Sequence, residues 1–214
     1  MKISYRRRLP HLQPPEATFF LTYQLAGALP RQVLSKIQEE YEQKKFDLMD
    51  RFYGDQPTCI TKLEHLQNEF AAKKDRYLDQ VLYGPTWLLE SEIAAVVQDS
   101  LHFLERQLRF WKLWAFTIMP NHVHLVCTLE PNAPPLHEVM RRHKGYTARQ
   151  CNRLLGREGK FWQEETFDRL IRGWDDFHQK VYYVLDNPVK ARLVDQWVKW
   201  SYIYCHSALY QEFC

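Results

Sequence analysis

The sequence predicts an α+β fold in which a small antiparallel sheet carries helices on one face, with a helical hairpin as an insert. Segments rich in aromatic and β-branched residues at 17–23, 111–129 and 166–171 are typical of strands. Segments between and after them repeat apolar residues at helical spacing. With 214 residues, of which 45% are hydrophobic, the chain can bury the core of one such domain.

The first third of the chain predicts an arm, a strand and two helices. Residues 1–16 are basic and contain three prolines, so we expect a basic N-terminal arm before the strand 17–23. Residues 31–53 and 59–82 repeat apolar side chains at helical spacing, with Glu and Lys dense between them. Such helices expose one face to solvent, and we expect them to form an insert at about 31–82 without chemistry of its own.

The remaining elements follow in an order that predicts the fold. A helix begins at Ser91, a typical N-cap residue, and another spans about 136–155 before Gly156. A third helix spans about 175–187, and we expect Pro188 to end it because proline disfavours helical backbone in the residue before it. The order strand, helix, hairpin, helix, strand, helix predicts a ferredoxin-like sheet. The expected organisation is an arm, a single domain and a C-terminal tail, residues 1–16, 17–200 and 201–214.

The distribution of charged residues along the chain indicates more than the net charge does. The chain has 29 basic and 26 acidic residues, a net charge of +3 that by itself indicates little. Two stretches contain basic residues and no acids, one at the N-terminus and one in the helix 136–155. Their members include Arg6, Arg7 and Arg8 in the first, and Arg141, Arg142, Lys144 and Arg149 in the second. Such clusters are typical of contacts with a phosphate backbone, although a solvated helix face is the common alternative.

Cysteine usage and hydropathy predict a reduced, cytoplasmic protein. The five cysteines are scattered and form no C-x-x-C pair, which argues against a disulfide framework and a structural zinc site. No apolar run follows the basic N-terminus as it would in a signal peptide. No apolar stretch approaches the roughly 20 residues that span a bilayer, so we expect no membrane partner.

The hairpin 111–129 contains two histidines separated by one residue. We expect a tight turn at Pro120-Asn121 between its strands. Because successive side chains of a strand point to opposite faces, His122 and His124 share one face. Two imidazoles held in this way can bind one metal ion. Such a pair also arises by chance and is often structural, so the motif alone leaves both interpretations open.

The helix 175–187 supplies a candidate nucleophile. Tyr183 and Asn187 are four residues apart and therefore lie one above the other on the helix. A phenol beside an amide ligand, both directed at the histidine strand, would form a phosphoryl-transfer site with a covalent intermediate. Tyr182 adjoins it, about 100° round the helix. The spacing to Asn187 favours Tyr183, although a tyrosine near a helix end is more often a packing residue.

Three motifs in this order resemble those of a known family. They are Met119-Pro120-Asn121-His122-Val123-His124, then Phe161-Trp162-Gln163, then Tyr183-Val184-Leu185-Asp186-Asn187-Pro188-Val189-Lys190-Ala191. Together they resemble the HUH tyrosine transposases of single-strand insertion sequences, in particular their domesticated relatives, the REP-associated tyrosine transposases. The resemblance covers about Pro85 to Trp200 and the strand 17–23, and nothing is carried over to the helical insert.

The resemblance implies a nuclease that cuts and rejoins single-stranded DNA beside a hairpin without ATP. It implies His122, His124 and Asn187 as ligands of Mg²⁺ or Mn²⁺; Asn187 stands where mobile-element members often have Gln. It implies Tyr183 as the nucleophile, which forms a 5′-phosphotyrosine link. Family members are monomers or homodimers, and no feature of this sequence decides between these states. When bound to DNA, such a protein is expected at the nucleoid.

The same resemblance gives the basic clusters a role at the DNA. Arg141, Arg142, Lys144 and Arg149 would hold the phosphate backbone. Arg6, Arg7 and Arg8 would reach a groove of the hairpin stem. Trp162 is a candidate for stacking on an unpaired base, with packing as the preferred role.

Two other functions compete with this one. A nucleotide hydrolase with a histidine nucleophile would need a third histidine two residues after His124, where the chain has Val126. A non-catalytic module that binds hairpin DNA or RNA through the basic helix would leave the histidines structural. It predicts hairpin binding without a covalent adduct and without dependence on metal.

Overall fold

The chain folds as two units, which are described separately. A computed structural model describes residues 4–6, 10–12 and 16–213, with side chains from Glu16 onward. One unit combines Met1–Ala26 with Thr86–Cys214, and the other is Gly27–Pro85. The two histidines, Tyr183 and Asn187 all belong to the first unit.

The first unit contains a five-stranded antiparallel sheet with the strand order β6-β3-β5-β4-β7. Its strands are β3 (Thr18–Gln24), β4 (Trp111–Ile118), β5 (His122–Leu129), β6 (Phe167–Leu170) and β7 (Ile203–Cys205). The first four strands and the helices α3 (Ser91–Arg106) and α4 (Leu136–Leu154) follow the βαββαβ order of a ferredoxin-like fold. The predicted α+β class and antiparallel sheet are confirmed.

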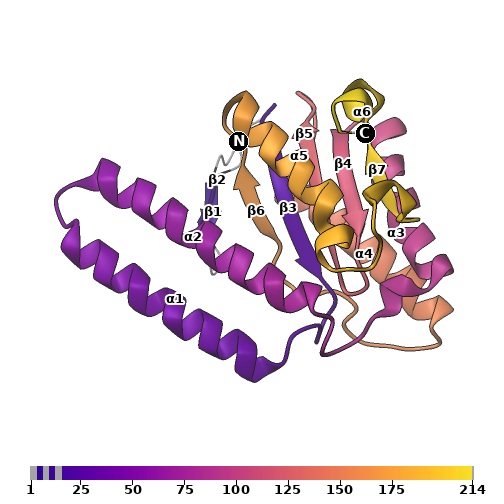
Figure 1. Ribbon diagram of the computed structural model, residues 1–214, viewed down its shortest axis with the longest axis horizontal. Coiled ribbons are helices and arrows are strands. Elements are labelled where there is room, and N and C mark those ends of the chain that lie inside the picture. The colour runs from indigo at the N-terminus through magenta and orange to yellow at the C-terminus, as the bar shows by residue number, and fades with distance from the viewer. Residues whose placement is uncertain (1–3, 7–9, 13–15, 214) are drawn as a thin grey trace. The chain divides into compact units, whose positions relative to one another are not determined.

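Helices cover both faces of this sheet, so the expectation of helices on one face is wrong. Tyr23 of β3 hydrogen-bonds to His143 of α4, with 2.7 Å between the phenol oxygen and Nε2. Phe20, three residues earlier and therefore on the other face, packs edge-on against Tyr183 of α5 (Gly173–Lys190) with ring centroids 5.6 Å apart. Helix α5 crosses in front of β3 and β5 in Figure 1. The sheet is therefore buried on both sides, and its central strands β3 and β5 are buried along almost their whole length.

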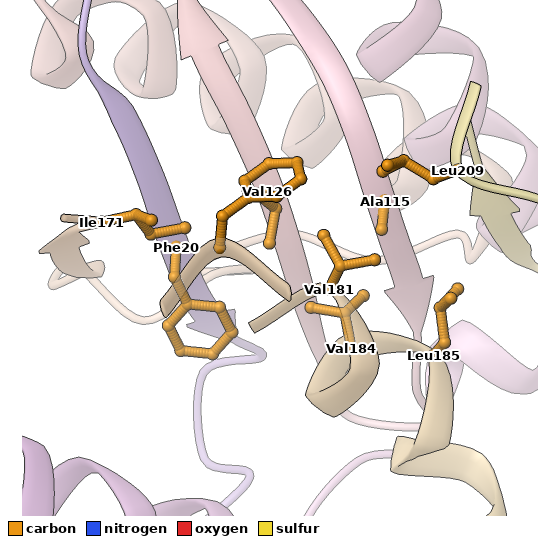
Figure 2. Packing of buried hydrophobic residues seen from close by; sticks show 9 residues of the cluster. Phe20, Ala115, Val126, Ile171, Val181, Val184, Leu185 and Leu209 are labelled. Atoms are coloured by element: carbon orange, nitrogen blue, oxygen red, sulfur yellow. The ribbon is translucent and has the colours of Figure 1, made fainter. Parts of the chain in front are cut away.

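A hydrophobic cluster fixes α5 on the sheet (Figure 2). Helix residues spaced one turn apart fill it, as the predicted apolar stripe requires. Its buried members are Phe20, Ala115, Val126, Ile171, Phe177, Val181, Val184, Leu185 and Leu209. Burying each large side chain contributes about 1.5–3 kcal/mol. The cluster thereby holds the helix that carries Tyr183 at a defined place over β3 and β5.

The end of the chain is part of the fold rather than the expected tail at 201–214. Strand β7 pairs with β4, and α6 (Ser207–Phe213) inserts Leu209 into the cluster against α5. The turn η2 (Trp197–Lys199) precedes them, and η1 (Trp87–Leu89) precedes α3. Three-residue strands such as β7 are too short to show a periodic pattern, which explains why the sequence did not predict it.

Helix α5 is longer than predicted at both ends. It begins at Gly173 and continues past Pro188 to Lys190. Proline lacks the N–H that would bond to the carbonyl of Val184, but it lies two residues from the helix end. The preference against helix before proline is therefore overridden by packing of the preceding turns. This correction keeps Asn187 inside the helix.

The sheet's other face is covered by α3 and α4 around a buried polar network. His143 of α4 contacts Ser100 of α3 through Nδ1 at 2.9 Å and Tyr23 of β3 through Nε2 at 2.7 Å. All three side chains are buried. Burial lowers the pKa of His143 to about 3, so the ring is neutral at physiological pH. The network links both helices to the strand that lies beside the histidines.

The second unit is the predicted helical hairpin. Helices α1 (Arg31–Arg51) and α2 (Gln56–Asp79) pack through Tyr41 and Phe70, whose ring centroids are 5.4 Å apart. Helix α2 begins three residues before the predicted start at 59, because Asp55 accepts a hydrogen bond from the Thr58 backbone N–H.

Part of the expected N-terminal arm is ordered as strands. Residues Ser4–Arg6 (β1) and Pro10–Leu12 (β2) pair antiparallel. Within the described residues, no helix is long and apolar enough to cross a membrane.

Candidate active site

Strand β5 places His122 and His124 side by side, as the strand period predicts. Both rings are fully buried, and their Nε2 atoms lie 3.0 Å apart. Their planes are nearly perpendicular, at 80°. The two ring nitrogens therefore point into one shared space rather than into separate packing positions.

Each Nδ1 atom is held by a neighbouring polar side chain. His122 Nδ1 lies 2.7 Å from Asn121 Oδ1, and His124 Nδ1 lies 2.8 Å from the Thr22 hydroxyl. An amide oxygen only accepts, so His122 Nδ1 donates and its Nε2 presents a lone pair. Burial holds the pKa of His124 well below its usual value, and His122 lowers it further. Neutral rings are the form that binds metal ions.

The Thr22 hydroxyl allows His124 two tautomers. When it donates to His124 Nδ1, His124 Nε2 carries the proton and hydrogen-bonds to His122 Nε2. When it accepts instead, both Nε2 atoms present lone pairs to the same space, which a cation would bridge. The arrangement is thus satisfied without a ligand. It would receive a metal ion once the His124 proton moved from Nε2 to Nδ1 and the Thr22 hydroxyl turned to accept it.

The distance between the nitrogens fits a six-coordinate ion. Adjacent ligands of such an ion meet at right angles, so bonds of roughly 2.1 Å, as for Mg²⁺, separate them by about 3.0 Å. A tetrahedral zinc ion with bonds of about 2.1 Å would need about 3.4 Å between ligand nitrogens. The observed 3.0 Å between the Nε2 atoms of His122 and His124 equals the first of these separations and is also the length of the hydrogen bond between the two rings.

Tyr183 lies next to this pair. Its ring is edge-on to that of His124, with centroids 5.4 Å apart. Lys180 and Lys190 place their ammonium nitrogens 5.4 and 4.7 Å from the centre of the Tyr183 ring. By contrast, 57% of Tyr182 is exposed. Of the two adjacent tyrosines, the structure therefore brings Tyr183 to the histidines.

Two buried amides near this point have unmet hydrogen-bonding groups. Asn187, one turn after Tyr183 on α5, is fully buried. Gln24 of β3 is 1% exposed and pairs directly with His122 in the sheet register. Both amide atoms of each residue lack a hydrogen-bond partner within the described part of the chain. A buried amide oxygen that accepts no hydrogen bond fits a divalent ion as its missing partner, and Gln24 lies directly opposite His122 in the sheet.

The sequence singled out Asn187, whereas Gln24, Thr22 and Lys180 were not predicted to lie at this site. Gln24 and Thr22 lie about 100 residues before the histidines and become their neighbours through strand pairing. A strand at 17–23 was predicted, but its partner and register were not. Lys180 lies one turn before Tyr183, and its helical spacing was the available signal.

The basic residues of α4 lie on a helix that covers the opposite face of the sheet from the histidines. Arg141 binds Glu138 with Nη2–Oε1 at 2.6 Å, and Arg142 stacks over Phe110. Lys144 Nζ donates to the backbone oxygens of Gln163 and Glu164 and to the Thr166 hydroxyl. Arg149 is exposed.

The other expected DNA contacts are placed as follows. Arg7 and Arg8 lie outside the described residues, and Arg6 is described only through its backbone in β1. Trp162 is 6% exposed; its Nε1 donates to Thr147 Oγ1 at 2.9 Å, and its ring packs edge-on to Tyr23. These contacts match the packing role of Trp162 rather than stacking on a base.

Comparison with known proteins supports a transposase fold around this site. Residues 65–170, just under half of the chain, match the family model described as "Transposase IS200 like". The matched part contains both histidines, whereas β3, Tyr183 and Asn187 lie outside it. Over these residues the chain is similar to the IS200-like transposases, and the resemblance that its motifs indicate is confirmed.

A more particular likeness comes from a solved structure. It is described as "Structure of the REP associates tyrosine transposase bound to a REP hairpin". The two structures superpose with a TM-score of 0.57 at 17% sequence identity, over 98% of this chain and 87% of that chain. At this identity the likeness shows the fold. Among curated proteins, none has a sequence that matches this chain.

Proposed function

We propose that this protein cleaves and rejoins single-stranded DNA beside hairpin sequences, through a covalent 5′-phosphotyrosine intermediate and with a divalent metal ion. The observation that carries the proposal is the position of Tyr183 against His124, whose Nε2 faces that of His122 at 3.0 Å. The transposase family match and the fold shared with a hairpin-bound tyrosine transposase support it.

The chemistry is a transesterification that conserves the phosphodiester energy. The Tyr183 phenol oxygen attacks the scissile phosphorus, forming a phosphotyrosine ester with the 5′ end of one fragment. The bond from phosphorus to the 3′ oxygen breaks, and the phenol proton ends on the released 3′-hydroxyl. Attack by a 3′-hydroxyl on the phosphotyrosine reverses the step and joins new ends.

His122, His124 and Asn187 would hold the ion, Mg²⁺ or Mn²⁺, which would polarise the scissile phosphate. Imidazole and amide ligands suit Mn²⁺ at least as well as Mg²⁺. The ammonium groups of Lys180 and Lys190 flank the Tyr183 ring and would attract the phosphate toward the phenol by Coulomb forces.

The duplex part of the hairpin needs a separate contact. The exposed side chains of Arg141, Arg142 and Arg149 on α4 and the N-terminal Arg6, Arg7 and Arg8 are proposed to hold its phosphates. Lys144 would act by fixing the loop at 163–166, which its ammonium group binds.

A labelled-DNA assay tests this proposal. Single-stranded DNA with candidate hairpins carries a 3′ label, because the fragment that stays on the tyrosine is the one with the 3′ end. With Mn²⁺, a denaturing gel should show a labelled protein band for the wild type and for Tyr182→Phe. The band should be absent for Tyr183→Phe and His124→Ala. Hairpin binding without any adduct, with and without metal, would favour the non-catalytic module instead.

A further inference from the structure

Gln24 occupies a position in the sheet that no motif assigns. It is the last residue of β3 and lies directly opposite His122 in the antiparallel register. Directly paired residues have Cβ atoms about 4.5–5.5 Å apart and point to the same face. The Gln24 side chain therefore shares the face that holds the two histidines.

The backbone around Gln24 is firmly held. Its carbonyl oxygen accepts from the Gln163 N–H at 2.8 Å, and the next residue, Leu25, donates to the Asn121 carbonyl at 2.8 Å. Asn121 in turn fixes His122 Nδ1. The position of Gln24 relative to His122 is thus set on two sides by hydrogen bonds.

The side chain of Gln24 is buried, and its amide group makes no hydrogen bond to the described residues. It is 1% exposed, and neither Oε1 nor Nε2 has a hydrogen-bond partner among the described residues. Thr22, two residues earlier on the same face, binds His124. A buried amide without a partner costs free energy that an apolar residue of the same size would avoid. Packing alone therefore does not account for glutamine here.

We infer that Gln24 is a further ligand of the metal ion, binding it through Oε1 beside His122 and His124. This rests on the proposed function, because the ion is the one proposed there. A six-coordinate ion has positions beyond those of two histidines and Asn187, and a neutral amide oxygen is a ligand that Mg²⁺ and Mn²⁺ accept. Coordination would satisfy the orphaned oxygen of Gln24 in the same way as that of Asn187.

Binding of Mn²⁺ alone, measured by isothermal titration calorimetry without DNA, tests the inference. Gln24→Met keeps the side chain's length and removes the amide, so it should bind Mn²⁺ roughly tenfold more weakly than the wild type. Its resistance to urea without metal should be equal or greater, because the unmet amide is gone. The matched control is Gln179→Met, at an exposed position on α5, which should change neither quantity.

Gln24→Glu is an independent variant, for which we expect no loss of Mn²⁺ affinity, in contrast to Gln24→Met. Its carboxylate is a stronger ligand for a hard cation and should bind Mn²⁺ at least as tightly as the wild type. Wild-type affinity in Gln24→Met, with affinity lost in His124→Ala, would overturn the role of Gln24 and leave the proposed function standing. Weaker binding in Gln24→Glu would also overturn it. A wild-type protein without Mn²⁺ affinity would instead overturn the metal site of the proposed function.

Discussion

The ring of Tyr183 stands edge-on to the ring of His124, with an interplanar angle of 77° and centroids 5.4 Å apart. The two residues come from different elements, α5 and β5, and are 59 positions apart in the chain. The hydrophobic cluster between helix and sheet sets their separation. The proposed nucleophile and a proposed metal ligand are thereby held together by packing, independently of DNA.

Thr22 should control metal affinity through His124. Thr22→Val removes the hydroxyl that holds His124 Nδ1 in both of its tautomers and so orients the ring. Loss of such an orienting partner typically weakens metal binding about 10–100-fold. Calorimetry with Mn²⁺ measures this. The control is Thr18→Val on the same strand face, which breaks a 2.7 Å hydroxyl contact with Thr128 away from the histidines. Equal affinities for the two variants would refute the orienting role.

Stability should fall in acid because of His143. Its folded pKa is about 3, below the usual value of about 6.5 in an unfolded chain. Between these values the unfolded state binds a proton that the folded state does not. The free energy of unfolding should therefore fall by about 1.4 kcal/mol per pH unit from this residue as the pH drops below 6.5.

Urea unfolding at pH 7, 6 and 5 measures that slope. His143→Gln removes the titrating ring, so the variant should lose less stability per pH unit than the wild type. Identical slopes for the two proteins would contradict a neutral, buried His143.

Trp162 should matter for stability and not for DNA affinity. Trp162→Phe keeps an aromatic ring in the packing against Tyr23 and removes the donor to Thr147. Losing that hydrogen bond should cost about 0.5–1.5 kcal/mol in urea unfolding. Binding of labelled hairpin DNA should be unchanged. A clear loss of DNA affinity in a stably folded variant would restore the stacking role.

Leu209 should anchor the C-terminal helix against α5. Leu209 is 3% exposed within the cluster, so Leu209→Ala should lower the free energy of unfolding by roughly 2–5 kcal/mol. Leu154→Ala is a control, because half of Leu154 is exposed at the end of α4. Thermal and urea unfolding measure the stability of both variants. If both lose similarly little free energy of unfolding, α6 has no structural role.

Local patterns in the sequence predicted the parts of the site that lie within one element. Strand alternation placed His122 and His124 on one face, and helical spacing placed Tyr183 beside Asn187. The proposed contribution of Gln24 depends on pairing between β3 and β5, which no local pattern specifies. The second covered face was missed for a different reason, because a strand buried on both sides lacks clear alternation of polar and apolar residues. The prediction that Pro188 ends the helix was wrong because the packing of Val181, Val184 and Leu185 outweighs the local backbone preference.

Mass spectrometry of the protein after reaction with hairpin DNA and Mn²⁺ tests the central claim most directly. Nuclease treatment followed by trypsin should leave the peptide Val181–Lys190, which contains both adjacent tyrosines. We predict that this peptide carries a nucleotide joined through its 5′-phosphate, and that fragmentation places it on Tyr183. A nucleotide on Tyr182 would contradict the assignment of Tyr183 as the nucleophile. So would finding this peptide only in unmodified form when the same reaction gives a covalent protein–DNA band on a gel.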